Sequence, residues 1–280
     1  MIRRNSHQYA KALVLVSIAA IGLLTSTAIP ALAASFNKTG SMNAARESHT
    51  ATLLANGNVL VTGGDNYTDG FLASAELYNP ATGKWTFTGS MTTARVSHDA
   101  VLLQNGQVLV AGGYHDSNCC LASAELYNPA TGTWTATGNM TTGRAGFVMT
   151  LLPNGEVLAA GDDNSSTSAE LYNPATGTWT ATGSMTTGND TNWAVLLQNG
   201  EVFVLNDNLY KPSTGTWTAT AQDPIFAHAP LALLPNGDVF AAGAIQGDSI
   251  YNPSTNQWTN FAPPPAILRT KRFSPRCRRW

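Results

Sequence analysis

One short pattern recurs along the chain at nearly constant spacing. Glu-Leu-Tyr-Asn-Pro followed by Gly-x-Trp occupies residues 76–85, 125–134 and 170–179, and altered copies occupy residues 210–217 and 251–258. A chain that repeats one unit of about 40–50 residues builds the same supersecondary structure several times, and each copy buries its apolar faces against its neighbours. The pattern therefore predicts a repeat architecture before any single residue is considered.

Each repeat contains two pairs of short apolar runs, and each pair encloses a turn. In the first full unit they are residues 49–54 and 59–62 around Asn56-Gly57, then residues 74–79 and 85–88 around Pro80-Ala81-Thr82-Gly83. Asn-Gly between two such runs predicts a β-hairpin with a type I′ turn, in which both residues have positive φ. Proline and glycine supply a fixed and a permissive φ in the second turn. Each unit is therefore predicted to be a four-stranded antiparallel meander.

These units indicate the blades of a β-propeller. Short strands that recur with a period of about 40–50 residues, marked by glycine and aromatic residues, are typical of blades rather than of helical repeats. No repeat shows the sustained periodicity of an amphipathic helix. Tyr78 and Trp85, and their equivalents, stand seven residues apart on paired strands. They are expected to fill the space between adjacent blades as core residues.

The spacing of these markers resembles the kelch repeat. Gly63-Gly64, Tyr78 and Trp85 are followed at the same spacing by Gly112-Gly113, Tyr127 and Trp134, and an Arg-x-x-His group precedes both sets, at Arg46 and at Arg95. The resemblance spans about residues 36–265 and implies an all-β, kelch-type β-propeller with five recognisable four-stranded blades. A WD40 propeller is excluded because no Trp is followed by Asp. The Asp-box of sialidases is excluded because Ala175 and its equivalents replace that Asp.

The predicted strands form five complete blades and leave one additional strand at the N-terminus. Residues 36–42 align with residues 85–91, so the repeats at 35–265 begin with an orphan N-terminal fourth strand. The last blade already has its own fourth strand at residues 257–261. A ring closed without the orphan strand and an incomplete ring both fit this count. Residues 266–280 resemble no repeat, and they are expected to form a basic, disordered tail.

The N-terminal segment has the features of a signal peptide. Arg3, Arg4 and Lys11 precede or flank the apolar stretch 12–24, and Ala31-Leu32-Ala33 fits a cleavage site. Residues 1–34 are therefore predicted to be removed during secretion, which leaves no membrane span; a retained anchor is the alternative. We expect the mature protein to be extracellular or located at the cell surface.

The charge of the repeat region limits the choice of partner. Between this signal segment and the tail, six basic and 17 acidic residues give a net charge of −11. An acidic surface of this kind does not favour nucleic acid. A protein or carbohydrate ligand is predicted instead.

Almost all length variation between repeats lies in one connection. The second strand and the repeat Tyr are 17, 17, 13, 6 and 10 residues apart in the successive units. In a meander, this second-to-third-strand connection lies at the same end as the linkers between blades. Variable loops on a constant scaffold are the expected place for binding. The predicted ligand-binding residues on these loops are Arg46, Asp65, Asn66, Tyr67, Arg95, Tyr114, His115, Asp116, Arg144, Asp162 and Asp163.

The kelch resemblance also raises an enzymatic alternative, because kelch-type propellers include galactose oxidase, a copper radical enzyme. His, Tyr and Cys residues near the predicted loop face are His49, Tyr67, His98, Tyr114, His115, Cys119 and Cys120. However, His49 and His98 share a repeat position that becomes Phe147 in the third unit, which is typical of packing. We therefore predict a non-catalytic binding module without a cofactor. The alternatives are a degenerate galactose-oxidase-like copper oxidase, calcium at the Asp clusters, a vicinal disulfide at Cys119-Cys120, and a structural cell-surface repeat protein.

Overall fold

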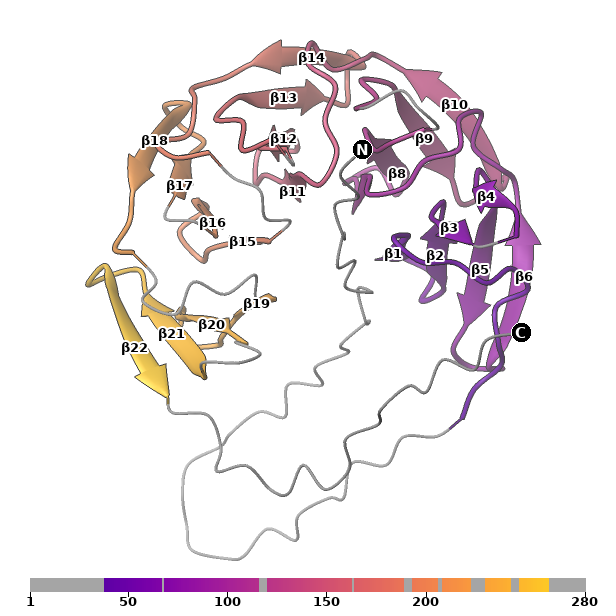
Figure 1. Ribbon diagram of the computed structural model, residues 1–280, viewed down its shortest axis with the longest axis horizontal. Helices are drawn as coiled ribbons and strands as arrows, with labels where there is room; N and C mark the ends of the chain where they lie inside the picture. The colour runs from indigo at the N-terminus through magenta and orange to yellow at the C-terminus, as the bar shows by residue number, and fades with distance from the viewer. Residues whose placement is uncertain are drawn as a thin grey trace, which may run out of the picture. The chain divides into compact units, whose positions relative to one another are not determined.

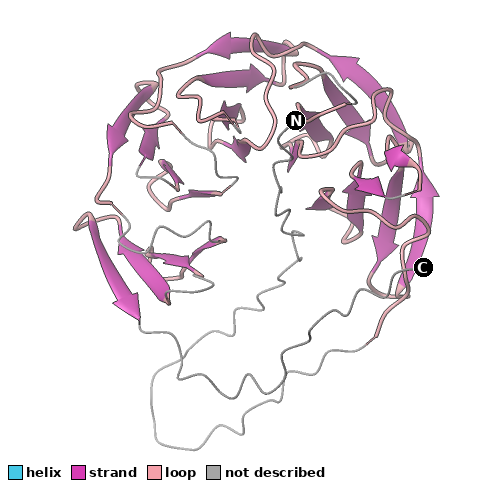
Figure 2. Cartoon of the chain, viewed as in Figure 1, coloured by secondary structure: helices cyan, strands magenta, loops and turns pink. Residues whose placement is uncertain are grey.

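The computed structural model describes residues 38–66, 68–115, 120–162, 164–188, 193–205, 208–222, 230–242 and 247–261. The predicted signal peptide and basic tail lie outside these ranges. Every regular element in the described ranges is a β-strand (Figure 2). None of these residues belongs to a helix that is long and apolar enough to cross a bilayer.

The described strands form five sheets of four strands and one small hairpin (Figure 1). The sheets are β1 (Thr50–Leu53), β2 (Val59–Thr62), β5 (Ala75–Asn79) and β6 (Lys84–Thr88); β7 (Asp99–Leu102), β8 (Val108–Ala111), β9 (Ala124–Asn128) and β10 (Thr133–Thr137); β11 (Val148–Leu151), β12 (Val157–Ala160), β13 (Ala169–Asn173) and β14 (Thr178–Ala181); β15 (Ala194–Leu196), β16 (Val202–Val204), β17 (Asn208–Lys211) and β18 (Thr216–Ala219); and β19 (Leu231–Leu233), β20 (Val239–Ala241), β21 (Asp248–Asn252) and β22 (Gln257–Phe261). The hairpin of β3 (Asp65–Asn66) and β4 (Gly70–Phe71) lies within the connection from β2 to β5. The predicted all-β fold with five four-stranded blades is confirmed.

The chain forms two compact units, residues 1–146 with 173–179, and residues 147–172 with 180–280. The first unit holds β1–β10, and the second holds β11, β12 and β15–β22. Each unit is described by itself below.

The hairpin between the first two strands of each blade differs from the predicted type I′ turn. Gly57 has a φ of 81°, but Asn56 does not have positive φ. The N–H of Gly57 donates to Leu54 O at 3.0 Å, and the N–H of Leu54 donates to Asn58 O at 2.9 Å. The loop therefore has three residues, a type I turn followed by a left-handed glycine. The Asn56 side chain accepts the N–H of Asn58 at 3.0 Å, so asparagine is needed as an acceptor.

A row of four side chains crosses each blade from its first strand to its fourth. In the first blade, Leu53 lies opposite Val59, Val59 opposite Tyr78, and Tyr78 opposite Trp85. We call this Leu-Val-Tyr-Trp set the aromatic row. Its ring pair is close, with the centroids of Tyr78 and Trp85 4.9 Å apart. The same register produces the rows Leu102-Val108-Tyr127-Trp134, Leu196-Val202-Tyr210-Trp217 and Leu233-Val239-Tyr251-Trp258.

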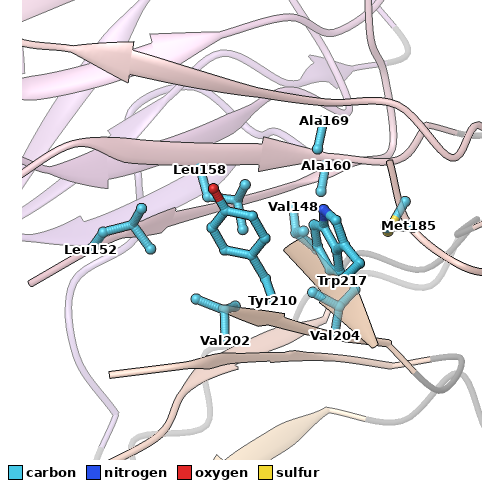
Figure 3. Packing of buried hydrophobic residues seen from close by; sticks show 10 residues of the cluster. All are labelled: Val148, Leu152, Leu158, Ala160, Ala169, Met185, Val202, Val204, Tyr210 and Trp217. Atoms are coloured by element: carbon cyan, nitrogen blue, oxygen red, sulfur yellow. The ribbon is translucent and has the colours of Figure 1, made fainter. Parts of the chain in front are cut away.

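Each of these later rows packs against the opposite surface of the preceding blade, which we call its leading face. In the second unit, Tyr210 and Trp217 lie against Leu152 and Leu158 of the preceding sheet (Figure 3). Matching clusters join the first blade to the second and the fourth to the fifth. The predicted core role of the repeated Tyr and Trp is therefore confirmed in the later blades, whereas Tyr78 and Trp85 of the first blade are half-buried. The buried Tyr rings, each at most 1 % exposed, are Tyr127, Tyr172, Tyr210 and Tyr251.

Hydrogen bonds complete the contact at the outer edge of the blades. The indole N–H of Trp134 donates to Gly89 O at 2.7 Å, while the N–H of Gly89 donates to Gly132 O at 3.1 Å. The hydroxyl groups of Thr88 and Tyr127 are 2.8 Å apart. The end of one fourth strand thus docks on the Tyr and Trp of the next blade.

Residues 39–40 make the same contacts with the first blade. The indole N–H of Trp85 donates to Gly40 O at 2.9 Å, and the N–H of Gly40 donates to Gly83 O at 3.1 Å. The hydroxyl groups of Thr39 and Tyr78 are 2.7 Å apart. The described part of the predicted orphan strand therefore occupies the place of a fourth-strand end, although residues 38–42 do not form a strand.

Candidate functional site

In the first unit, the linkers between blades and the second-to-third-strand connections lie at the same end of the sheets. Two β-bridges join them and pair Glu47 with Asp65 and Val96 with Tyr114. Gly64 and Gly113 precede the bridged loop residues and have φ values of 90° and 97°. A Cβ atom on either glycine would overlap the carbonyl oxygen of Glu47 or Val96. Glycine is needed here for both the left-handed backbone and the close approach.

Arg95 clamps the base of the variable connection in the second blade. Its Nη1 donates to Gly112 O at 2.8 Å and to Ser123 O at 3.0 Å, and these carbonyls belong to the two ends of the connection. Its Nη2 donates to Ser123 Oγ at 3.2 Å and to Glu125 Oε1 at 3.0 Å. Arg95 is fully buried. This guanidinium group therefore positions the loop from inside the blade instead of facing a ligand.

The same arrangement occurs in the first blade. Arg46 donates from Nη1 to Gly63 O at 2.8 Å and to Ser74 O at 2.9 Å, and from Nη2 to Glu76 Oε1 at 3.1 Å. Arg144, at the corresponding position of the next linker, is also fully buried. The three arginines were predicted to bind ligand, but the structure places them in the blade interior.

The carboxylate partners of these arginines are themselves saturated with hydrogen bonds. Glu125 accepts the N–H groups of Thr92 at 2.7 Å and Thr93 at 3.1 Å in addition to its bond with Arg95. In the fourth blade, Asn208 replaces the glutamate and accepts the N–H of Thr186 at 2.9 Å. The arginine position of that linker is Asn189, so both charges are lost together. A buried charge without its partner is strongly destabilising, which explains the joint loss.

Glu76 makes the first unit sensitive to acid. Burial raises the pKa of this carboxyl, but hydrogen bonds from Asn43, Ala44 and Arg46 outweigh burial and hold the pKa below its ordinary value. The stability that Glu76 contributes is therefore complete above its unfolded pKa of about 4.3, and it is lost as the pH falls through the lower folded pKa. Glu76→Gln is expected to reduce the free energy of unfolding at pH 7 and to flatten its decline below about pH 4.3.

Denaturant unfolding measured at several pH values checks this expectation. Glu156→Gln, a substitution in a hairpin turn of the second unit and outside the Arg46–Glu76 pair, is the control. An equal slope in wild type and Glu76→Gln would contradict the role of Glu76.

Asp65 is a carboxylate that the fold does not neutralise. Its Oδ1 is buried and has no hydrogen-bond partner among the described residues. Burial raises the pKa of Asp65, and the nearby charge of Glu47 raises it further. The neighbouring Asn66 has a local role, because its Oδ1 accepts the N–H of Asp69 at 2.6 Å and its Nδ2 donates to Ala45 O at 3.0 Å. Of these two predicted site residues, Asp65 is the one with an unpartnered acceptor.

An aromatic contact joins the variable connections of the first two blades. The ring centroids of Phe71 in β4 and His115 lie 6.4 Å apart, with the planes tilted by 48°. His115 follows Tyr114, and both are half-buried. Neither Phe71 nor the β3–β4 hairpin is among the features predicted from the sequence. The signal was Asp69-Gly70 directly before Phe71, since Asp-Gly favours a tight turn.

The remaining predicted site residues are not part of this group. Asp162 belongs to the second unit and is buried, and its Oδ1 accepts the N–H groups of Asn164 at 2.8 Å and Ser166 at 3.1 Å. It occupies the repeat position of Gly64 and shapes its own loop as a turn cap. Tyr67, Asp116 and Asp163 lie outside the described residues.

The described residues do not fit a copper site. His98 is 2 % exposed, and its Nε2 lies 3.1 Å from Thr50 Oγ1 and 3.3 Å from Thr62 Oγ1, which is the packing role predicted for this position. Within the described ranges, no three His, Cys, Asp or Glu side chains lie close enough together to hold a metal ion. Tyr67 and Cys119 of the copper alternative lie outside those ranges.

Comparison with known proteins agrees with this architecture. Residues 48–92 and 100–141 match the Kelch motif, and these stretches cover the two blades of the first unit. Among solved structures, the chain is similar to a fungal alcohol oxidase of the AA5 family in complex with copper, with a TM-score of 0.63 and 18% sequence identity. The match covers 79% of this chain and 54% of that chain, so this chain spans about half the length of the oxidase. No curated protein sequence matches. The five sheets and the two Kelch motifs identify the fold as that of kelch-type β-propeller blades.

Proposed function

We propose that the protein is a secreted, non-catalytic binding module that takes a carbohydrate ligand on the loops of its first two blades. The binding surface consists of Asp65, Phe71, Tyr114 and His115, and we call it the loop surface. The contact between Phe71 and His115 carries the proposal, because it joins two variable connections whose bases are fixed by Arg46 and Arg95. Binding loops held by a rigid scaffold are a common arrangement for recognition.

The chemistry of the loop surface suits a neutral sugar. Aromatic rings supply apolar contact area, while a few fixed polar groups give orientation and specificity. The half-buried carboxylate of Asp65 supplies an acceptor for a sugar hydroxyl group. The net charge of −11 on the repeat region disfavours an anionic ligand.

The raised pKa of Asp65 also favours a functional role. Burial and the charge of Glu47 both oppose its ionised form, so the group does not help the fold at neutral pH. Ionisable groups held in unfavourable environments are concentrated at functional sites.

Substitutions on the loop surface should weaken binding without unfolding the blades. Phe71→Ala and Asp65→Asn are each expected to reduce the affinity for a neutral oligosaccharide by about tenfold, since a lost aromatic or charge-assisted contact is worth about 1–2 kcal/mol. A neutral glycan array followed by calorimetric titration provides the measurement. Phe87→Ala is the control, because Phe87 is 61 % exposed on β6 and is not part of the loop surface.

Two results would contradict this function. Glycan binding that is absent in wild type, or equal in Phe71→Ala and Phe87→Ala, would exclude the loop surface as a sugar site. Stoichiometric copper with oxidase activity in the secreted protein would favour an enzyme instead.

A further inference from the structure

Among the described residues, the aromatic row of the first blade has less cover than the rows of the other blades. Leu53 is 62 % exposed, whereas its counterparts Leu102 and Leu233 pack against the cores between blades. Tyr78 is only half-buried, although the equivalent tyrosines of the other four blades are at most 1 % exposed. Thr39 and Gly40 cover the outer end of this row, near Tyr78 and Trp85. Its apolar inner end, around Leu53, is exposed within the ranges that the structure describes.

The leading face of the fifth blade is the second surface with little cover in the described part of the chain. Leu234 and Phe240 are half-buried there. Their counterparts in the other blades are at most 4 % exposed: Leu54, Leu103, Leu152 and Leu197 for Leu234, and Leu60, Leu109, Leu158 and Phe203 for Phe240.

These two open surfaces are the two halves of one interface that the chain already repeats. Between the fourth and fifth blades, Leu197 and Phe203 of a leading face cover Tyr251 and Trp258 of an aromatic row. The ring of Phe203 stacks on Tyr251 with centroids 4.7 Å apart and meets Trp258 at 5.9 Å. Phe240 is the same residue type at the same register position as Phe203. Tyr78 and Trp85 occupy the positions of Tyr251 and Trp258 on the opposing row.

We propose that two copies of this chain associate head to tail, with the leading face of the fifth blade of one copy on the aromatic row of the first blade of the next. Phe240 then stacks on the partner's Tyr78 as Phe203 stacks on Tyr251. The contact removes the exposed Leu53 from water, which is the dominant source of favourable free energy in such interfaces. Because the two surfaces differ, the contact is heterologous, and each bound copy offers a new surface to another.

Sedimentation equilibrium of the full chain tests the proposal. The apparent mass of wild type should rise above that of one chain as concentration increases. Leu53→Asp should abolish this rise and leave the circular dichroism and melting temperature unchanged, because the side chain is 62 % exposed. Phe87→Asp is the matched control, since Phe87 is 61 % exposed on the same sheet. Its counterpart Ala136 stays exposed although the second blade is covered, so this variant should associate as wild type does.

A mixing experiment separates head-to-tail association from a symmetric contact. Phe240→Asp should also be monomeric alone, but an equimolar mixture with Leu53→Asp should form a dimer that grows no further. Leu53→Asp retains an intact leading face on its fifth blade, and Phe240→Asp retains an intact aromatic row on its first blade. A wild type that stays monomeric at all concentrations would overturn the proposal, as would association of Leu53→Asp alone or a mixture that remains monomeric.

Discussion

Arg95→Met is expected to lower the free energy of unfolding of the first unit by about 3–5 kcal/mol, the usual cost of removing one partner from a buried ion pair. The substitution would leave Glu125 buried without its cation, and it would also remove the Arg95 donor from Gly112 O and from Ser123 O. Ser123 O would keep the N–H of Gly112 at 3.1 Å. Urea unfolding followed by circular dichroism provides the measurement. Because Arg95 holds both ends of the connection that bears Tyr114 and His115, ligand affinity should fall as well.

The clamp can be distinguished from a general effect of losing a positive charge. Lys84→Met removes a charge from an exposed position on β6, and it should change the stability by less than about 0.5 kcal/mol. Adding Glu125→Asn to Arg95→Met removes both charges, as in the fourth blade, where Asn189 stands in the arginine position and Asn208 in the glutamate position. The double variant should recover about 0.5–3 kcal/mol. Equal losses of unfolding free energy in Arg95→Met and Lys84→Met would contradict the role of Arg95 in holding the two ends of the connection.

Gly89→Ala is expected to separate the first two blades at their outer edge. A Cβ atom on Gly89 would overlap Gly132 O, the acceptor of the Gly89 N–H. Overpacking of this kind costs about 1–3 kcal/mol, and the lost hydrogen bond adds to it. Gly89 does not have positive φ, so the expected loss reflects the close approach alone. Thermal unfolding and the accessibility of Trp134 to a fluorescence quencher would measure it.

The fifth blade indicates which second substitution should restore the contact. Ala221 occupies the position of Gly89 there, and its N–H donates to Asn256 Oδ1 at 2.8 Å instead of to a glycine carbonyl. Asn256 has a φ of 54°, a value that asparagine tolerates better than most residues. Gly132→Asn should therefore be mild alone and should rescue Gly89→Ala. Additive losses in the double variant would show that the two positions do not compensate each other.

Much of the fold could be predicted from the sequence because the residues that make the same contacts recur at the same spacing in several repeats. The constant interval between Tyr78 and Trp85 and between their equivalents predicts paired strands and a shared packing role, and both are confirmed. The type I′ turn predicted for the first hairpin is wrong, because Asn-Gly occurs in two kinds of turn. Asparagine can adopt positive φ, but here Asn56 accepts a backbone N–H, and only Gly57 is left-handed.

The candidate site was harder to predict than the scaffold. Arg46 and Arg95 stand in linkers, where charged side chains usually face water, so their burial depends on a partner elsewhere in the chain. The sequence does contain a signal for this pairing. Glu76 and Glu125 each follow 30 residues after these arginines, and the fourth repeat lacks both the arginine and the glutamate. Phe71 could not be placed from sequence, since its contact with His115 joins two loops of different blades.

The hydrogen bonds of the tryptophans give the protein an internal optical reporter. In the second to fifth blades the indole N–H donates to the backbone at the end of the preceding fourth strand, and in the first blade it donates to Gly40 O. The fluorescence of each indole therefore depends on the docking of two neighbouring segments more than on the formation of its own sheet. During refolding, far-ultraviolet circular dichroism would follow the sheets, whereas tryptophan emission would follow their assembly. If sheets form before they dock, the two signals should recover on separate timescales.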